Sequence, residues 1–250
     1  MSSVSVIDAE EMRGASPSFA TDLRPLLIGL FALAIFDMLS LDLPLIRLFG
    51  TPSGFAWRDH WLTASVLHDG TRNAAWLLFV LLVIGIWRPI RIFASLSRRE
   101  RLWWLGTTLL CVGLIPLLKR HNLSSCPWDL AEFGGMARHV SHWLPGQPDG
   151  GPGGCFPSGH ASTAFAFLAG WFVMRRSAPR TARVWLVLTV IIGLTLGWAQ
   201  MMRGAHYASH SLWTAWICWA VSVVSFHAFR NWRESVHAHP SATAPRSMDN

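Results

Sequence analysis

The chain has 250 residues, of which 52% are hydrophobic and 14% are charged, and it contains 15 tryptophans. It is too apolar for an ordinary soluble domain, and its composition is typical of a membrane-embedded chain with aromatic side chains at the lipid–water interface. The formal net charge is +7, but the arginines cluster between apolar runs and form no single basic face. This pattern argues against nucleic-acid binding and leaves lipid headgroups as the anionic partner.

The polar segment 1–23 lacks the basic start and small-residue cleavage site of a secretory signal, so we predict a disordered cytoplasmic tail there. Residues 24–230 form the predicted membrane domain, and residues 231–250 a second disordered cytoplasmic tail. The domain contains apolar runs that are each near the roughly 20 residues a helix needs to cross a bilayer. The runs cover residues 25–43, 73–90, 102–118, 160–176, 183–201 and 208–229. The sequence therefore predicts an all-α polytopic membrane protein with about six transmembrane helices.

The arginines also predict the orientation of the chain, because short cytoplasmic loops retain positive charge. They follow the second, fourth and sixth runs: Arg88, Arg91, Arg98, Arg99 and Arg101, then Arg175, Arg176, Arg180 and Arg183, then Arg230 and Arg233. We therefore expect these loops and both termini to face the cytoplasm of a bacterial-type inner membrane. The segments 50–73 and 119–159 then lie on the periplasmic face.

These two outer segments differ in character. Segment 50–73 mixes apolar and charged side chains, which predicts an amphipathic helix along the membrane interface; an irregular loop with anchoring tryptophans is the alternative. Segment 119–159 is rich in Gly and Pro between residues 145 and 154, which indicates turns or a mobile stretch.

Three polar clusters stand at the predicted periplasmic ends of the helices. Lys119, Arg120 and His121 end the third run, Ser158, Gly159 and His160 open the fourth, and Gln200, Arg203, His206 and His210 follow the fifth. A hydroxyl and free backbone N–H groups before a helix bind anions, and Lys119 and Arg203 would add positive charge for phosphate oxygens. His160 and His206 could divide nucleophilic attack and proton transfer between them. The pattern therefore favours phosphoryl transfer.

These motifs resemble those of the type 2 phosphatidic acid phosphatase (PAP2) superfamily of membrane lipid phosphatases. Lys119 leads to Cys126-Pro127, Pro157-Ser158-Gly159-His160 matches in full, and His206-Tyr207 falls where the family's last His stands. The resemblance implies a PAP2-like helical bundle without metal or cofactor. It also implies that His206 attacks phosphorus to form a phosphohistidine and that His160 protonates the departing lipid oxygen. Lys119, Ser158 and the Gly159 amide would stabilise the phosphoryl oxygens.

The chain departs from the family pattern at three positions. Cys126 and Gln200 replace two arginines, and His210 replaces the Asp that would orient the nucleophile. We propose that Arg203, one helical turn from Gln200 and His206, supplies one missing charge, and that Arg120 is a weaker candidate for the other.

The missing carboxylate could come from elsewhere in the chain. Asp37, inside the first apolar run, is the main candidate, because an unpaired charge there is expensive; a buried Asp that serves helix packing is the alternative. Asp42, Asp129 and Glu132 are further candidates, each with an ordinary exposed loop position as the alternative.

Cys126 and Cys155 flank the second outer segment, where an oxidising compartment permits a disulfide; two unpaired loop cysteines are the alternative. A bond would hold the loop after Lys119 next to Pro157 and replace the family's ionic tie with a covalent one. Cys111 and Cys218 lie inside apolar runs and are expected to be ordinary core residues.

Other functions remain open from the sequence. His206 and His210 share a helix face and could bind a metal with His160 or His121, although no zincin Glu accompanies them; a membrane cytochrome is a weaker alternative. A degenerate, non-catalytic phospholipid-binding protein is the main rival from another class, and a lipid-to-lipid phosphotransferase would use the same residues. As substrates we expect a phosphorylated cell-envelope lipid, such as phosphatidic acid, phosphatidylglycerophosphate, undecaprenyl diphosphate or lipid A.

Overall fold

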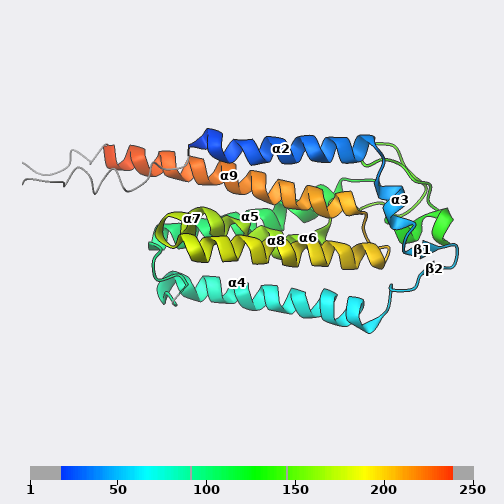
Figure 1. Ribbon diagram of the computed structural model, residues 1–250, viewed down its shortest axis with the longest axis horizontal. Helices are drawn as coiled ribbons and strands as arrows, with labels where there is room; N and C mark the ends of the chain where they lie inside the picture. Colours follow the sequence, from blue (N-terminus) through cyan, green and yellow to red (C-terminus); the bar gives the residue numbers. More distant parts are fainter. Residues whose placement is uncertain (1–17, 91, 145, 239–250) are drawn as a thin grey trace, which may run out of the picture.

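The computed structural model describes residues 18–90, 92–144 and 146–238. Helices run back and forth along one long axis (Figure 1). The long ones are α2 (Phe19–Met38), α4 (Thr71–Trp87), α5 (Arg98–Arg120), α8 (Pro179–Met202) and α9 (Ala208–Ala238). In the described residues five helices are long and apolar enough to span a membrane, the second of them counted from Leu62. The predicted all-α polytopic fold is therefore confirmed.

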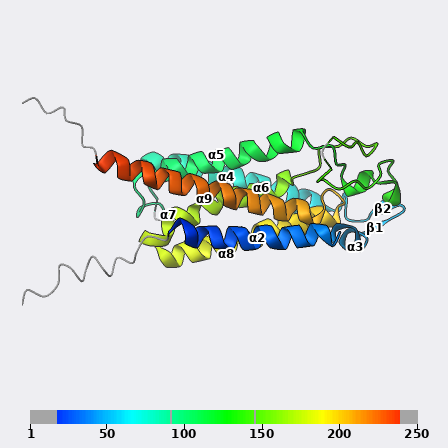
Figure 2. The same cartoon turned by 90° about the horizontal axis from the view of Figure 1, so that it is seen from above.

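The predicted fourth span is helical but interrupted. It consists of α6 (Gly159–Phe165), the 3₁₀ turn η4 (Ala166–Leu168) and α7 (Ala169–Ser177), which follow one another without a gap. Because the pass is divided, it is not among the five long helices. Its first part lies in the middle of the bundle in both views (Figures 1 and 2). The described residues thus run along the bundle six times, five times as one long helix and once as the divided α6–η4–α7 segment.

Small residues bring the central pass close to its neighbours. A Cβ at Gly193 of α8 would lie 2.3 Å from the Phe165 ring, and one at Gly170 of α7 would lie 2.4 Å from the Trp104 ring. Phe165 and Trp104 are both buried. Close approach at small residues is a main source of helix association in membranes, so these glycines fix where α6 and α7 sit.

The two ends of the bundle differ in chemistry. At one end lie α3 (Asp42–Ile46), the hairpin of β1 (Gly50–Thr51) and β2 (Gly54–Phe55), and the long connection between α5 and α6 (Figure 1). That connection contains two short 3₁₀ helices, η2 (Pro127–Asp129) and η3 (Ala131–Phe133). We call this the loop end. The N-terminus of α2 and the C-terminus of α9 lie at the opposite end, which carries the arginine-rich connections.

A buried ion pair stabilises the arginine-rich end. Arg175 of α7 donates two hydrogen bonds, of 2.6 and 2.7 Å, to the carboxylate of Asp22 on α2. His227 Nε2 of α9 lies 2.8 Å from the same carboxylate. Because all three side chains are largely buried, removal of one partner would leave a costly unpaired charge. The pairing therefore ties three helices together away from the loop end.

Two predicted boundaries and one predicted helix are corrected. The N-terminal helix begins at Phe19, so residues 18–23 do not belong to a tail; Ser18 caps it by accepting a hydrogen bond from the Thr21 amide. Helix α9 extends to Ala238, eight residues into the predicted C-terminal tail. Segments 1–17 and 239–250 lie outside the described residues. The amphipathic helix predicted over residues 50–73 is replaced by the β1–β2 hairpin and a π-helix, η1 (Leu62–Gly70), that continues into α4.

Candidate active site

The second and third polar clusters meet at the loop end. The Ser158 amide donates to the His210 carbonyl over 3.1 Å, and the Thr214 hydroxyl donates to the Ser158 carbonyl over 2.9 Å. These two bonds attach the start of α6 to the start of α9. The rings of His160 and His206 consequently lie side by side, with their centroids 5.9 Å apart.

His206 lies on a tight turn between α8 and α9. Gly204 has a φ of +72°, and a Cβ there would lie 2.4 Å from the Phe55 ring, so glycine meets both the conformational and the steric demand. The amides of Ala205 and His206 both donate to the Gln200 carbonyl. His206 is only 1% exposed. Burial lowers the pKa of His206 well below the usual histidine value, and nearby His210, Lys119 and His160 lower it further. The ring is therefore held neutral, the form that carries a free lone pair.

A disulfide touches the His206 ring. Cys126 and Cys155 are bonded to each other, and Cys155 Sγ lies 3.5 Å from His206 Nδ1. A disulfide sulfur carries no proton, so this contact can be at most a weak donation from Nδ1–H to sulfur. That arrangement leaves Nε2 as the ring nitrogen available for chemistry. The Cys155 backbone carbonyl also interacts with the rings of both His206 and His210.

Three candidate phosphate ligands, Ser158, Gly159 and Lys119, lie near the two histidines. Ser158 caps α6, and its hydroxyl accepts from the Ala161 amide over 3.5 Å. The space beside the Gly159 Cα is open, since a Cβ there would meet no heavy atom within 4 Å. Lys119 is half-buried and close enough to interact electrostatically with both His160 and His206. Lys119 and the N-terminus of α6 thus lie near both histidines.

The proposed replacements for the missing arginines have different surroundings. Gln200 is 1% exposed, and within the described part of the chain neither its Oε1 nor its Nε2 has a hydrogen-bond partner. Arg203 Nε donates to the Arg58 carbonyl over 2.8 Å, and its charge reaches His160. Burial lowers the pKa of Arg203. Arg120 is exposed at the end of α5. Gln200 and Arg203 therefore each interact with a site histidine, whereas Arg120 is exposed at the end of its helix.

The four acidic candidates separate into two pairs. Asp129 accepts from the Cys126 amide over 3.2 Å, and Glu132 forms a surface ion pair with Arg47. Both stabilise the outer loops. Asp42, by contrast, accepts two hydrogen bonds from Ser209, the residue before His210. Burial raises the pKa of Asp42 to about 6, although the bonds from Ser209 oppose the shift.

Asp37 lies on the same side of the site as Asp42. Its Oδ2 accepts hydrogen bonds of 2.8 Å from the indole nitrogens of Trp143 and Trp213. His142 Nε2 lies 3.5 Å from the same oxygen. The ring of His142 in turn stands 5.5 Å from the His210 ring, measured between centroids. Asp37 is thus connected to the site through His142 and His210.

His68 is a site candidate that the sequence analysis missed. It projects from η1, and its ring centroid lies 4.2 Å from that of His160. Its Nδ1 is 3.0 Å from Asp69 Oδ1, which also pairs with Arg72 at 3.3 Å. The sequence offered only a histidine and an aspartate in an amphipathic stretch. The π-helical turn that aims His68 at His160 has no sequence signal of its own, although such turns are frequent at functional sites.

The donor atoms near His206 include one group with the spacing of a metal site. Among the described residues, the nearest side-chain donor atoms of Cys126, Cys155 and His206 lie within 4.8 Å of one another. Both cysteines are in the disulfide, however, and a metal ligand must be a thiolate. With the disulfide closed, this group offers a single imidazole.

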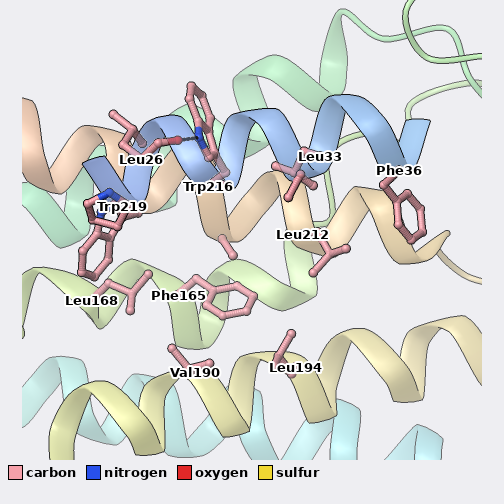
Figure 3. A pocket seen from close by; sticks show the side chains of 14 residues that line it. Leu26, Leu33, Phe36, Phe165, Leu168, Val190, Leu194, Leu212, Trp216 and Trp219 are labelled. Atoms are coloured by element: carbon pink, nitrogen blue, oxygen red, sulfur yellow. Dashed lines mark hydrogen bonds between the residues drawn. The ribbon is translucent and has the colours of Figure 1, made fainter. Parts of the chain in front are cut away.

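Several apolar grooves adjoin the bundle, and two of them differ in their relation to the site. One, of about 440 Å³, lies between α2, α8 and α9 and is lined by Leu33, Trp216 and Leu194, with no titratable side chain (Figure 3). The other, of about 260 Å³, runs between α4, α5 and α6 and reaches Gly159. The second groove therefore extends along the helices to Gly159, the residue before His160.

Comparisons with known proteins identify the family and the fold. The family model of the PAP2 superfamily matches residues 100–234, more than half of the chain and all three motifs. The chain belongs to the PAP2 superfamily, as the motifs predicted. Its structure is similar to the crystal structure of the first transmembrane PAP2-type phosphatidylglycerolphosphate phosphatase from Bacillus subtilis, with a TM-score of 0.50 and 16% sequence identity; the match covers 86% of this chain and 96% of that one. No curated protein matches the chain significantly. The likeness shows the fold of a multi-pass membrane phosphatase.

Proposed function

We propose that the protein is a membrane lipid phosphatase that hydrolyses a phosphate monoester or diphosphate of a cell-envelope lipid through a phosphohistidine intermediate. The observation that carries the proposal is the pairing of two imidazoles, half-buried His160 and buried His206, with ring centroids 5.9 Å apart beside the N-terminus of α6. A phosphoryl group between them would contact one ring on the attacking side and the other on the leaving side. That in-line arrangement is what phosphoryl transfer requires.

The reaction then proceeds in two balanced steps. The Nε2 lone pair of His206 forms a bond to phosphorus while the bond from phosphorus to the lipid oxygen breaks, and that oxygen takes a proton from His160. A water molecule next attacks phosphorus and gives a proton to His160, and the N–P bond returns its electrons to His206. Lys119, Ser158, the Gly159 amide and Gln200 would bind the phosphoryl oxygens. No step calls for a metal.

The groove that reaches Gly159 supports a lipid substrate. Arg72 stands at its margin and its remaining lining is mostly apolar, so a phosphate at His160 could keep its acyl chain in the membrane. Ala75 lines this groove, and Ala32 lies in the first apolar segment, beside the groove of Figure 3. Ala75→Phe is expected to raise KM for a long-chain lipid but not for a short-chain soluble phosphate, whereas Ala32→Phe should change neither.

The arginines at one end of the bundle and the disulfide at the other favour one orientation in the membrane. The arginine-rich connections favour a cytoplasmic location for that end and for both termini, in a bacterial-type inner membrane. The histidine site would then face the periplasm. The Cys126–Cys155 disulfide fits that oxidising side.

The decisive test is a phosphate-release assay on the purified full-length protein. The substrates are phosphatidic acid, phosphatidylglycerophosphate, undecaprenyl diphosphate and phosphorylated lipid A. We expect one or more to be hydrolysed, with kcat/KM reduced by about 10³-fold or more in His206→Ala and about 10²-fold or more in His160→Ala. His121→Ala, an exposed histidine at the same end, is the matched control and should retain full activity.

Two further readouts separate the alternatives. Rapid acid-free denaturation during turnover of a ³²P-labelled substrate should trap label on the wild-type protein and none on His206→Ala. Activity that survives in His206→Ala would contradict the mechanism, and activity lost to a chelator would contradict metal independence. Transfer of the label to a second lipid instead of water would identify a phosphotransferase of the same chemistry.

A further inference from the structure

A small polar chamber is lined in part by His210 and is separate from the groove that reaches Gly159. It encloses about 40 Å³ and is lined by residues from α2, α3, the long outer loop and α9. Six of its side chains matter here: Asp37, Asp42, Ser124, His142, Tyr207 and His210. A buried site needs roughly 10–15 Å³ of such space for each water molecule. The chamber is therefore large enough for a few waters and too small for a lipid phosphate.

Buried polar atoms converge on this chamber without protein partners. Within the described residues these atoms are His210 Nδ1, the Tyr207 hydroxyl and Asp37 Oδ1, while His142 Nε2 has only its 3.5 Å contact with Asp37 Oδ2. Buried polar groups in folded proteins are almost always hydrogen-bonded to protein or to ordered water. Three unpartnered atoms around one cavity, with His142 Nε2 only weakly held beside them, point to bridging water as their common partner.

Two carboxylates give the chamber a negative side. Asp42 is held by the Ser209 amide and hydroxyl, and Asp37 by the indoles of Trp143 and Trp213. The two acids are close enough that Asp37 raises the pKa of Asp42. His142, which contacts Asp37 and lies beside His210, stacks on Phe156 with ring centroids 4.2 Å apart and planes at 10°.

The donor set does not fit a metal ion. In the described chain, the donor atoms lining the chamber do not form a group of three within 4.8 Å, and the group found near the site is formed by Cys126, Cys155 and His206. Water therefore remains the occupant that the size and the scattered donors support.

We propose that this chamber supplies the acid that His210 itself lacks: water joins the Asp42 and Asp37 carboxylates to His210 Nδ1, and the resulting network positions His210 beside His206. The rings of His206 and His210 lie 5.8 Å apart between centroids. When His206 bonds to phosphorus its ring gains positive charge, which the carboxylates offset through His210. Asp37, Asp42 and His210 are thus positioning residues. The inference rests on the proposed phosphatase function.

A double-mutant cycle tests the inference. His210→Asp places a carboxylate directly beside His206, so it should make the chamber's acids dispensable. Asp42→Asn keeps an acceptor for Ser209 and removes the charge. We expect Asp42→Asn to lower kcat by about tenfold or more in the wild-type background with KM changed less than about threefold, and to lower it by less than about twofold in the His210→Asp background.

The outcomes separate this inference from the proposed function. Equal losses in both backgrounds would mean that Asp42 is merely structural, and an unchanged kcat in Asp42→Asn would also overturn the inference while leaving the phosphatase intact. A wild-type protein inactive on every lipid offered would overturn both.

A second variant guards against misfolding of His210→Asp. Ser124→Val places a methyl group in the chamber and leaves every histidine and carboxylate in place. It should reproduce the loss of kcat in Asp42→Asn without a matching loss of phosphate-analogue binding, measured with vanadate. Full activity in Ser124→Val would contradict a role for water in the chamber.

Discussion

The rings of His68 and His160 lie with their centroids 4.2 Å apart, although the two residues come from η1 and α6 and are separated by 92 positions. His68 also contacts Asp69, whose carboxylate pairs with Arg72. The candidate acid of the proposed reaction thus has a second imidazole and a charged pair on its outer side. His68 lies outside the three sequence motifs, so the structure adds a residue to the site that the motifs do not contain.

His68 is expected to support proton transfer at His160. His68→Ala should lower kcat by about tenfold, a fraction of the effect of losing a catalytic acid itself, and should shift the alkaline limb of the pH–rate profile. His60→Ala, from the same outer segment, is the control. A profile that keeps its shape and height in His68→Ala would show that the contact is packing alone.

Gln200 is expected to bind the phosphoryl group in place of an arginine. The side-chain Oε1 and Nε2 of Gln200 are buried and have no hydrogen-bond partner among the described residues. Its backbone carbonyl accepts a hydrogen bond from the His206 amide. Gln200→Leu should therefore reduce kcat/KM by about 10- to 100-fold, the value of a hydrogen bond to a charged group. Gln200→Glu should reduce it further because a carboxylate repels phosphate. Equal activity of wild type and Gln200→Leu would exclude this role.

The disulfide is expected to stabilise the loop end. It closes a loop with a sequence separation of 29, so its loss should cost about 3.6 kcal/mol of unfolding free energy in the chain-entropy view. Cys126→Ser should lower the melting temperature and the activity together, because Cys155 contacts His206. Cys111→Ala, at a free buried cysteine, controls for the loss of a thiol. Titration of denatured, unreduced protein should find two thiols; four would contradict the bond.

Asp42 is expected to make stability depend on pH. Its pKa is raised from 3.8 to about 6 in the folded state, so the folded protein binds the proton more tightly than the unfolded chain does. Its contribution is therefore most favourable below pH 4 and falls as the pH rises to about 6. The melting temperature of Asp42→Asn, measured relative to wild type, should accordingly increase between pH 4 and pH 7. A difference independent of pH would rule out the raised pKa.

The transmembrane architecture could be predicted because it depends on local composition. An apolar run of helical length must cross the bilayer wherever it occurs, and the Pro-Ser-Gly-His motif marks the start of one such helix. The prediction was less successful where no periodicity exists. The outer segment 50–73 contains a hairpin and a π-helix, and the ends of α2 and α9 extend beyond the apolar runs because capping by Ser18 and contacts with neighbouring helices continue them.

By itself the sequence determined the spans, their alternating direction, the family and the candidate histidines, since each depends on residue type over short distances. Only the tertiary structure decided that His68 meets His160, that Asp42 binds Ser209 and that buried polar atoms of Asp37, Tyr207 and His210 share one chamber. Those contacts join residues far apart in the chain. They arise from how the outer loops pack across the helix ends, and that packing follows from shape and hydrogen bonding, which no local pattern encodes.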